Sequence, residues 1–209
     1  MPTESATALP LPVVPIRPRE AVLLATATRL FRSRGFHATS MQDLAEALGM
    51  NRGSLYHYIE SKDDLLWMVL TRSFDLLETR VRPILEGGDP PLDRLRAAIR
   101  EHLRVAADHA DELSLIQIEL RSLPPGRRAA MVARRDSYEA LWRRTLEAAV
   151  EDGSIRPFDV RLAGIGILSA CNWFTQWFRP DGGLTVDEIA AAFCDLFLAG
   201  LRQRAEGGA

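Results

Sequence analysis

Apolar side chains recur at intervals of three and four residues through most of this 209-residue chain. That spacing places them along one face of a helix, whereas a half-buried strand needs apolar and polar side chains in alternation. No segment shows sustained alternation of that kind. We therefore predict an all-α protein of about nine helices without strands.

Glycine, proline and capping patterns divide the chain into helices. Ser40 to Asp43 and Ser61 to Asp64 have the spacing of a capping box, and Gly35, Gly49 and Gly153 stand where helices would end. The predicted helices cover residues 19–34, 40–48, 52–58, 61–86, 92–106, 113–123, 127–151, 158–178 and 185–202.

Composition excludes several other classes of protein. Residues 1–18 contain five prolines and no basic start before an apolar run, so we expect a flexible arm rather than a signal peptide. The most apolar stretch, residues 162–178, is at the short limit for a membrane span and carries polar side chains. Cys171 and Cys194 fit no metal or redox spacing. These features predict a cytoplasmic protein with reduced thiols, no membrane segment, no metal and no cofactor.

Charge is distributed unevenly along the chain, although the net charge is only −2. Residues 17–58 contain six arginines and three acidic residues, whereas residues 59–209 contain 20 basic and 24 acidic residues. A small basic region joined to an acidic body is typical of a DNA-binding domain attached to a regulatory domain.

The basic region contains two short predicted helices joined by a turn with Gly49 and preceded by a longer helix. This is the helix-turn-helix arrangement, in which the second short helix enters the major groove while the first supports it at an angle. Small side chains at Ala45 and Gly49 permit the two helices to approach closely. The expected supporting core consists of Leu44, Ala45, Leu48, Met50 and Leu55.

The run LLATATRLFRSRGFHATSMQDLAEALGMNRGSLYHYIESKDDLL resembles the DNA-binding domain of the tetracycline-repressor (TetR) family of bacterial transcription regulators. The resemblance covers residues 19–66 and is carried by Leu30-Phe31, Gly35-Phe36, Thr39-Ser40, Leu44-Ala45, Gly49-Met50, Leu55-Tyr56-His57-Tyr58 and Lys62. It implies a homodimer that binds a palindromic operator and releases it when a small effector binds a second helical domain. The implied domains are residues 19–62 for DNA binding and 63–209 for effector binding and dimerisation.

The resemblance also assigns DNA contacts. Ser40 and Gln42 stand at the start of the supporting helix, while Tyr56 and Lys62 are implied phosphate ligands. The recognition helix carries Arg52, Gly53, Ser54, His57 and Tyr58. Independently of the family, an arginine can bind guanine through two hydrogen bonds, and a glycine lets the backbone approach DNA. The alternative is a solvated helix start that contacts nothing.

The C-terminal part resembles one subgroup of the family. The segment from Asn172-Trp173 through Trp177-Phe178-Arg179-Pro180-Asp181-Gly182, followed by residues 185–201, is similar to the end of regulators of fatty-acid and steroid breakdown. Those regulators sense acyl-CoA thioesters, so the resemblance implies an acyl-CoA effector.

The predicted helix 127–151 carries an apolar stripe of Met131, Tyr138, Trp142, Leu146 and Ala149. By helical geometry Arg128 and Arg135 project into that stripe, where an unpaired charge is costly. Two interpretations stay open: an internal salt bridge, for example to Glu119, or an anionic ligand such as the phosphates of coenzyme A. His102 and His109 lie at the edge of another apolar stripe. They either line the same cavity or lie only at its rim.

These patterns together predict an effector cavity that takes residues from several helices. Its expected residues are Trp67, Phe74, His102, Ile116, Arg128, Arg135, Tyr138, Trp142, Asn172 and Trp173.

The predicted helix 158–178 is apolar nearly all round, so it needs cover on two sides, and a second subunit would provide it. Val186, Ile189, Phe193, Phe197 and Gly200 give the last helix a matching stripe. A four-helix dimer interface is expected to include Phe174, Phe178, Phe193 and Phe197.

An enzyme and a helical adaptor without DNA binding are the alternatives to a regulator. The chain contains no Glu-x-x-His pair, no Gly-x-Ser-x-Gly and no phosphate-binding loop motif. We therefore expect no catalytic residues.

Overall fold

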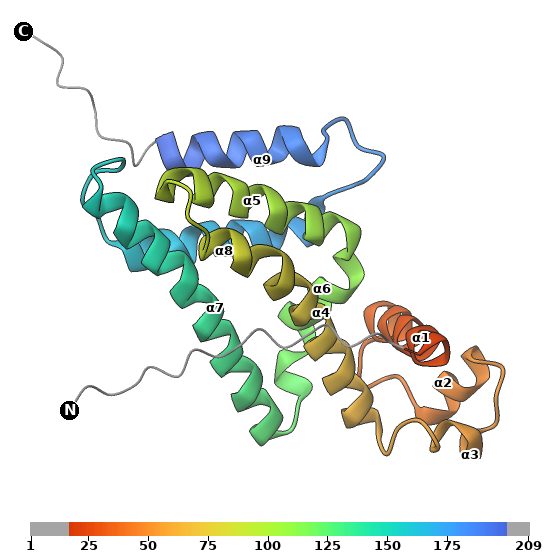
Figure 1. The fold of residues 1–209 in the computed structure, drawn as a ribbon. Coiled ribbons are helices and arrows are strands. Elements are labelled where there is room, and N and C mark those ends of the chain that lie inside the picture. Colours follow the sequence, from red (N-terminus) through yellow and green to blue (C-terminus); the bar gives the residue numbers. More distant parts are fainter. Residues whose placement is uncertain (1–16, 200–209) are drawn as a thin grey trace, which may run out of the picture.

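The computed structural model describes residues 17–199 and shows nine α-helices and no β-strand within that range (Figure 1). The elements are α1 (Pro18–Arg34), α2 (Met41–Ala47), α3 (Arg52–Leu55), α4 (Lys62–Leu85), α5 (Pro91–Asp108), α6 (Ala110–Glu119), a 3₁₀ turn (Leu120–Ser122), α7 (Pro125–Glu151), α8 (Val160–Trp177), α9 (Val186–Cys194) and a π-helical turn (Asp195–Ala199). The all-α prediction is confirmed.

Helices α1, α2 and α3 gather at one end of the molecule, and the long α4 runs from them into the body (Figure 1). In the body α5 packs against α4, α7, α8 and α9, while α6 packs against α1, α4 and α8. Helices α4 and α6 therefore both connect the small N-terminal unit with the larger helical body.

The apolar stripes expected from the sequence form one continuous core. In the N-terminal unit Leu44, Ala45 and Leu55 are fully buried, and Phe31 packs edge-on against Phe36 with ring centroids 5.3 Å apart. In the body the predicted stripe of α7 is buried, namely Met131, Tyr138, Trp142, Leu146 and Ala149, and Leu141 and Thr145 are buried beside it. The hydrophobic pattern was thus sufficient to identify which faces turn inward.

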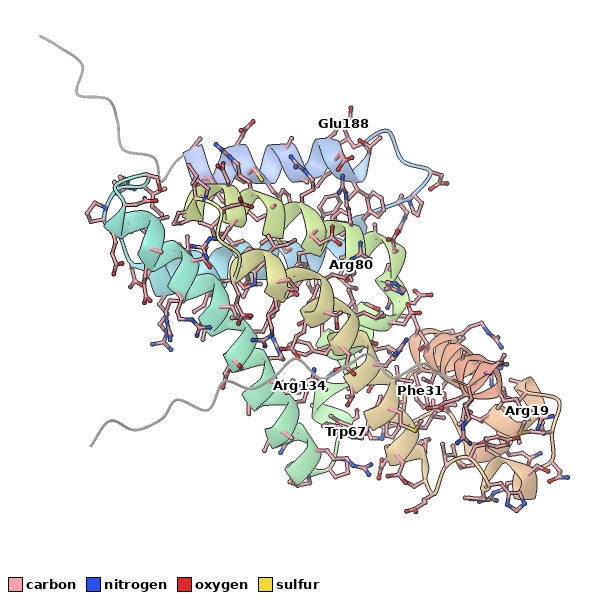
Figure 2. The ribbon with its side chains drawn as sticks, viewed as in Figure 1. Arg19, Phe31, Trp67, Arg80, Arg134 and Glu188 are labelled. Atoms are coloured by element: carbon pink, nitrogen blue, oxygen red, sulfur yellow. The ribbon has the colours of Figure 1, made fainter. Side chains whose placement is uncertain are left out.

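Ion pairs join the helices along α4. Asp64 pairs with Arg127, and Arg134 pairs with both Asp75 and Glu78; Figure 2 shows Arg134 between α7 and α4. Arg80 of α4 pairs with Glu101 of α5 at 2.5 Å. These contacts hold α4 against α7 and α5 along its length.

Three helices differ clearly from the prediction. The helix predicted at residues 113–123 is α6 at Ala110–Glu119, followed by the 3₁₀ turn. The third helix ends at Leu55 rather than near Tyr58, because residues 56–58 form a turn. The last α-helix ends at Cys194, and the chain continues as a π-helical turn to Ala199. The expected arm falls largely in residues 1–16, and Gly200 follows the last described residue, so both predictions lie outside the described residues. No helix in the described range is long and apolar enough to cross a membrane.

Candidate nucleic-acid interface and effector cavity

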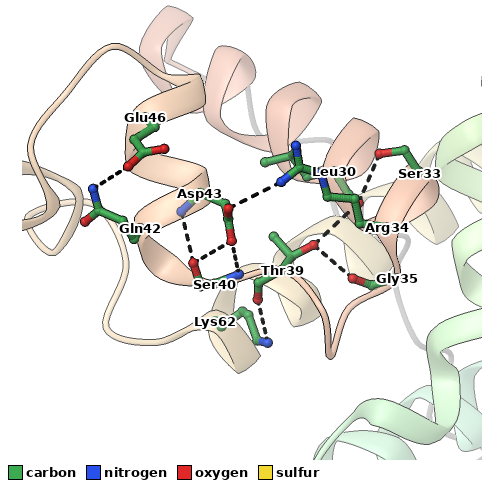
Figure 3. Close-up of polar contacts among 10 residues, drawn as sticks. All are labelled: Leu30, Ser33, Arg34, Gly35, Thr39, Ser40, Gln42, Asp43, Glu46 and Lys62. Carbon is green, nitrogen blue, oxygen red and sulfur yellow. Dashed lines mark hydrogen bonds and ion pairs between the residues drawn. The ribbon is translucent and has the colours of Figure 1, made fainter.

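The two short helices are fixed by side-chain caps. Ser40 and Asp43 form a reciprocal capping box at α2: Asp43 N donates to Ser40 Oγ at 3.1 Å, and Ser40 N donates to Asp43 Oδ2 at 2.7 Å (Figure 3). Hydrogen bonds from Ser40, followed by the charge of Arg34, lower the pKa of Asp43. Asn51 caps α3 by accepting from Ser54 N at 2.7 Å. The start of α3 is therefore held in a defined orientation.

An exposed polar surface surrounds the start of α3, and Arg52, Gly53, Tyr56, His57 and Tyr58 are all exposed on it. Arg52 Nη2 donates to the hydroxyl of Tyr56 at 3.0 Å, and the guanidinium carbon lies 5.7 Å from the centre of that ring. The arginine fork is thus held at the surface, where it can turn outward to a base edge.

The remaining predicted contacts flank this surface. Gln42 is exposed and donates to Glu46 at 2.8 Å (Figure 3), whereas the Ser40 hydroxyl is already engaged with Asp43 at 2.5 Å. Arg19 Nη1 donates to the hydroxyl of Tyr58 at 3.3 Å. The contact with Arg19, which the sequence did not indicate, adds a positive charge from α1 to the same surface.

Lys62, the single lysine of the chain, does not project toward solvent as the resemblance implied. Its ammonium donates to the carbonyl oxygens of Phe36, Thr39 and His37 at 2.8, 2.7 and 3.4 Å, and lies 4.4 Å from the centre of the Phe36 ring. A lysine has three donors, and these three carbonyls engage them. Lys62 thus binds the connection between α1 and α2 to the start of α4, and its contact with a DNA phosphate stays a prediction.

A second anchor of that connection was not predicted. Glu119, the last residue of α6, is buried and accepts the backbone N–H of Phe36 at 3.0 Å. Its other carboxylate oxygen accepts from Ser122 at 2.7 Å. Because 83 residues separate the partners, no local pattern could have indicated this contact.

A cavity of about 300 Å³ lies among α4, α5, α6, α7 and α8. It brings together six residues of the predicted effector set, namely Phe74, His102, Ile116, Arg135, Tyr138 and Asn172. Further lining residues that sequence analysis missed are Leu77, Ala106, Leu113, Gln117, Val132, Asp136, Glu139, Ile165, Leu168, Ser169, Cys171 and Thr175. They belong to ordinary helix faces, so only the packing shows that they share a cavity.

Four predicted cavity residues lie elsewhere. Trp67 stands near the start of α7 with the Arg127 guanidinium 6.0 Å from its ring, and Trp142 is buried in the core behind the cavity wall. Trp173 is 62% exposed on the outer face of α8. Arg128 is exposed in a separate hollow. His109 is a rim residue within 4.0 Å of Glu112.

Two buried polar side chains of the cavity, His102 and Tyr138, are uncharged at neutral pH. Tyr138 OH and His102 Nδ1 are 3.3 Å apart, and both side chains are buried. Burial lowers the pKa of His102 to about 4, against a smaller opposing contribution from its hydrogen bond with Asn172. Burial also raises the pKa of Tyr138. The cavity therefore combines this neutral hydrogen-bonding pair with apolar side chains and with the charged residues Arg135, Asp136 and Glu139.

Of the two interpretations of Arg128 and Arg135, the structure does not support the internal salt bridge to Glu119. Glu119 is occupied by Phe36 and Ser122, and neither Arg128 nor Arg135 forms an ion pair within residues 17–199. The ion-paired arginines of this part of the helix are their neighbours Arg127 and Arg134. Arg135 lines the cavity, so its guanidinium is available to a ligand.

The expected dimer face needs one correction. Phe174 is fully buried inside the subunit, stacked on Phe178 with ring centroids 4.5 Å apart, so it cannot contact a second chain. Phe178, Phe193 and Phe197 are half-buried. The large apolar side chains exposed on α8 and the final turn are Leu162, Ile165, Trp173, Trp177 and Leu196.

Comparison with known proteins shows which family has both a DNA-binding unit and a helical body of this kind. The model of the family described as bacterial regulatory proteins, tetR family, matches residues 23–67, and that of the tetracyclin repressor-like C-terminal domain matches residues 88–201. The transcriptional repressor KstR2 of Rhodococcus jostii is 32% identical over 88% of this chain and 91% of its own length.

Solved structures agree with these matches. The ketosteroid regulator KstR2 of Mycobacterium tuberculosis is similar with a TM-score of 0.84 and 28% identity, covering 91% of this chain and 98% of that one. AibR, solved with isovaleryl coenzyme A and operator DNA, has a TM-score of 0.80 and 32% identity, covering 86% and 98%.

Proposed function

The chain belongs to the TetR family of bacterial regulatory proteins, and from that premise we propose that it is a repressor that binds a near-palindromic operator as a homodimer and releases it when an acyl-CoA occupies the cavity. One observation carries the proposal: α4 begins at the exposed surface around α3 and contributes Phe74 and Leu77 to the cavity. We assign residues 19–62 to DNA binding and 63–209 to effector binding and dimerisation.

The DNA-binding role is supported by the arrangement around α3. A short helix with a capped N-terminus, exposed Arg52 and Gly53, and a buried contact to α2 through Leu55 suits insertion into the major groove. The crystal structure of AibR contains operator DNA, and that protein covers nearly all of this fold.

The effector class is supported by the cavity. Phe74, Leu77 and Leu168 offer apolar contact to an acyl tail, while Arg135 offers a guanidinium fork to a hydrogen-bond acceptor of the ligand. AibR was solved with an acyl-CoA, and this independent similarity agrees with the chemistry of the walls.

Homodimerisation is supported by the exposed apolar side chains of α8 and the final turn. Leu162 is 65% and Leu196 70% exposed in the single subunit, and Trp173 and Trp177 of α8 are exposed as well. Large exposed apolar side chains are expected where a second subunit covers them. Two subunits joined there would present two copies of α3, as a palindromic operator requires.

We propose no catalytic activity. The relatives are transcriptional regulators, and the titratable cavity residues His102 and Tyr138 are held in their neutral forms.

A gel-shift assay tests the proposal. Fragments flanking the gene are mixed with the purified dimer and excess random DNA, and acyl-CoAs of increasing chain length are then added. We expect a shifted protein–DNA band that persists in excess random DNA. At least one acyl-CoA should abolish this band. A helical adaptor would bind no fragment, and a regulator of a different effector class would ignore the whole series; either result contradicts the proposal.

A further inference from the structure

Residues 120–135 contain five arginines and no acidic residue, in a chain with net charge −2. Two of these arginines, Arg127 and Arg134, face α4 and are ion-paired there. Arg121, Arg128 and Arg135 have no ion pair within the described residues. The unpaired arginines thus come from the 3₁₀ turn after α6 and from the neighbouring positions of α7.

Arg121 and Arg128 line one open hollow of about 470 Å³ between the end of α6 and the start of α7. Its other lining residues are Gln117, Ile118, Leu120 and Val132. Gln117 and Val132 also line the effector cavity, so the hollow and the cavity share part of their wall. The hollow and the cavity are therefore adjacent, and a ligand that occupied both would pass these two side chains.

The charged residues that line the cavity differ from those that line the hollow. Arg135 lies in the cavity wall together with the carboxylates of Asp136 and Glu139, whereas the hollow contains arginines and no acidic residue among its lining. Arg128 precedes Arg135 by seven residues, about 10 Å along the helix axis. A phosphate group is therefore favoured in the hollow and disfavoured near the two carboxylates.

We propose that this hollow is the subsite for the phosphate groups of the effector, with Arg121 and Arg128 as their charge partners and the acyl group in the adjoining cavity. The inference rests on the proposed function and adds the ligand's orientation and the two residues that select a coenzyme A thioester over an uncharged thioester. Guanidinium forks form charge-assisted hydrogen bonds to phosphate oxygens, and Ile118 and Leu120 provide apolar contact beside them.

The test compares the affinities of two ligands for wild type and for one double variant. Wild type and the double variant Arg121→Gln/Arg128→Gln are titrated calorimetrically with the acyl-CoA that releases the operator best, and with the matching acyl-pantetheine thioester, which lacks phosphates. Arg144→Gln is the matched control, because Arg144 is exposed on α7 outside both the hollow and the cavity.

We expect the double variant to lose at least tenfold in affinity for the acyl-CoA while its affinity for the pantetheine thioester and its operator affinity without effector stay unchanged. The control should match wild type with both ligands. Unchanged acyl-CoA affinity in the double variant would overturn the subsite while leaving the proposed function intact. Weaker operator binding in the absence of effector would show that the arginines contact DNA instead. A wild type that binds neither thioester would overturn the effector class itself.

Discussion

The carboxylate of Glu119 accepts the backbone N–H of Phe36 at 3.0 Å, joining the last residue of α6 to the connection between α1 and α2. Helix α6 also contributes Leu113, Ile116 and Gln117 to the cavity. A shift of α6 would therefore act on the N-terminal unit through this hydrogen bond, the packing of α6 against α1 and the ion pair between Arg32 and Asp111. Lys62 holds the same connection from the start of α4, so both helices that lead from the cavity meet there.

Replacing Glu119 should weaken the link between the two sites. Glu119→Ala leaves the buried Phe36 N–H without its acceptor, while Glu119→Gln retains an acceptor oxygen. We expect the alanine variant to bind operator and effector separately, but to show a smaller effector-induced change in operator affinity than the glutamine variant. By thermodynamic reciprocity the operator should then also change effector affinity less. If both variants lose only thermal stability, Glu119 is an anchor and not a coupling residue.

Lys62→Met should destabilise the N-terminal unit, because three backbone carbonyls lose a charged donor. A loss of about 1–3 kcal/mol in the free energy of unfolding is expected. Operator and random DNA should be bound more weakly by the same factor, with an unchanged slope of log affinity against log salt concentration. A slope reduced by about one unit would instead show that Lys62 neutralises a phosphate.

Arg52→Ala should reduce sequence discrimination. The exposed guanidinium at the start of α3 can form two hydrogen bonds with guanine, so its removal should cost about 1–3 kcal/mol on the cognate operator and much less on random DNA. Competition gel shifts on both DNAs measure the difference. An operator affinity equal to that of wild type would remove Arg52 from the recognition surface.

Leu196→Glu should convert the dimer to monomers, because this side chain is 70% exposed in the single subunit and would bring a charge into the interface. Light scattering gives the oligomeric state, and circular dichroism checks that the helices remain. Phe174→Ala is the contrasting variant: its side chain is buried within the subunit, so it should lose about 3–5 kcal/mol of stability. A wild type that is monomeric at micromolar concentration would contradict the interface.

Stability should decrease on mild acidification through His102. Its folded-state pKa is about 4, while the unfolded value is 6.5, so between these values the unfolded chain binds more protons. The free energy of unfolding should therefore fall as the pH is lowered from about 6.5 to 4, by up to about 3 kcal/mol. Urea unfolding of wild type and His102→Gln at several pH values checks this: the variant should lack that part of the slope.

Local sequence patterns predicted the buried helix faces and the helix starts of this protein. Helical spacing of apolar residues identified the buried face of α1, with Leu30 and Phe31, and that of α7, with Tyr138 and Trp142. Capping preferences identified Ser40 and Ser61 as helix starts. These properties depend on residues within a few positions of each other, so the order of residues is enough to specify them.

The roles of single side chains were decided by the tertiary structure. Lys62 has the family's spacing, yet its ammonium is turned into the carbonyls of residues 36–39, which only the packing of α4 against α1 brings within reach. Helical geometry placed Arg128 and Arg135 on the same face of α7, but it could not show that Arg135 lines the cavity while Arg128 lines a separate hollow. Likewise Phe174, expected at the dimer interface, is buried within the subunit, and Trp173, expected in the cavity, is exposed. Their burial depends on how α8 is rotated against the body. Periodicity indicates that a helix has a buried face, but the partner of each side chain is set by contacts between segments far apart in the chain.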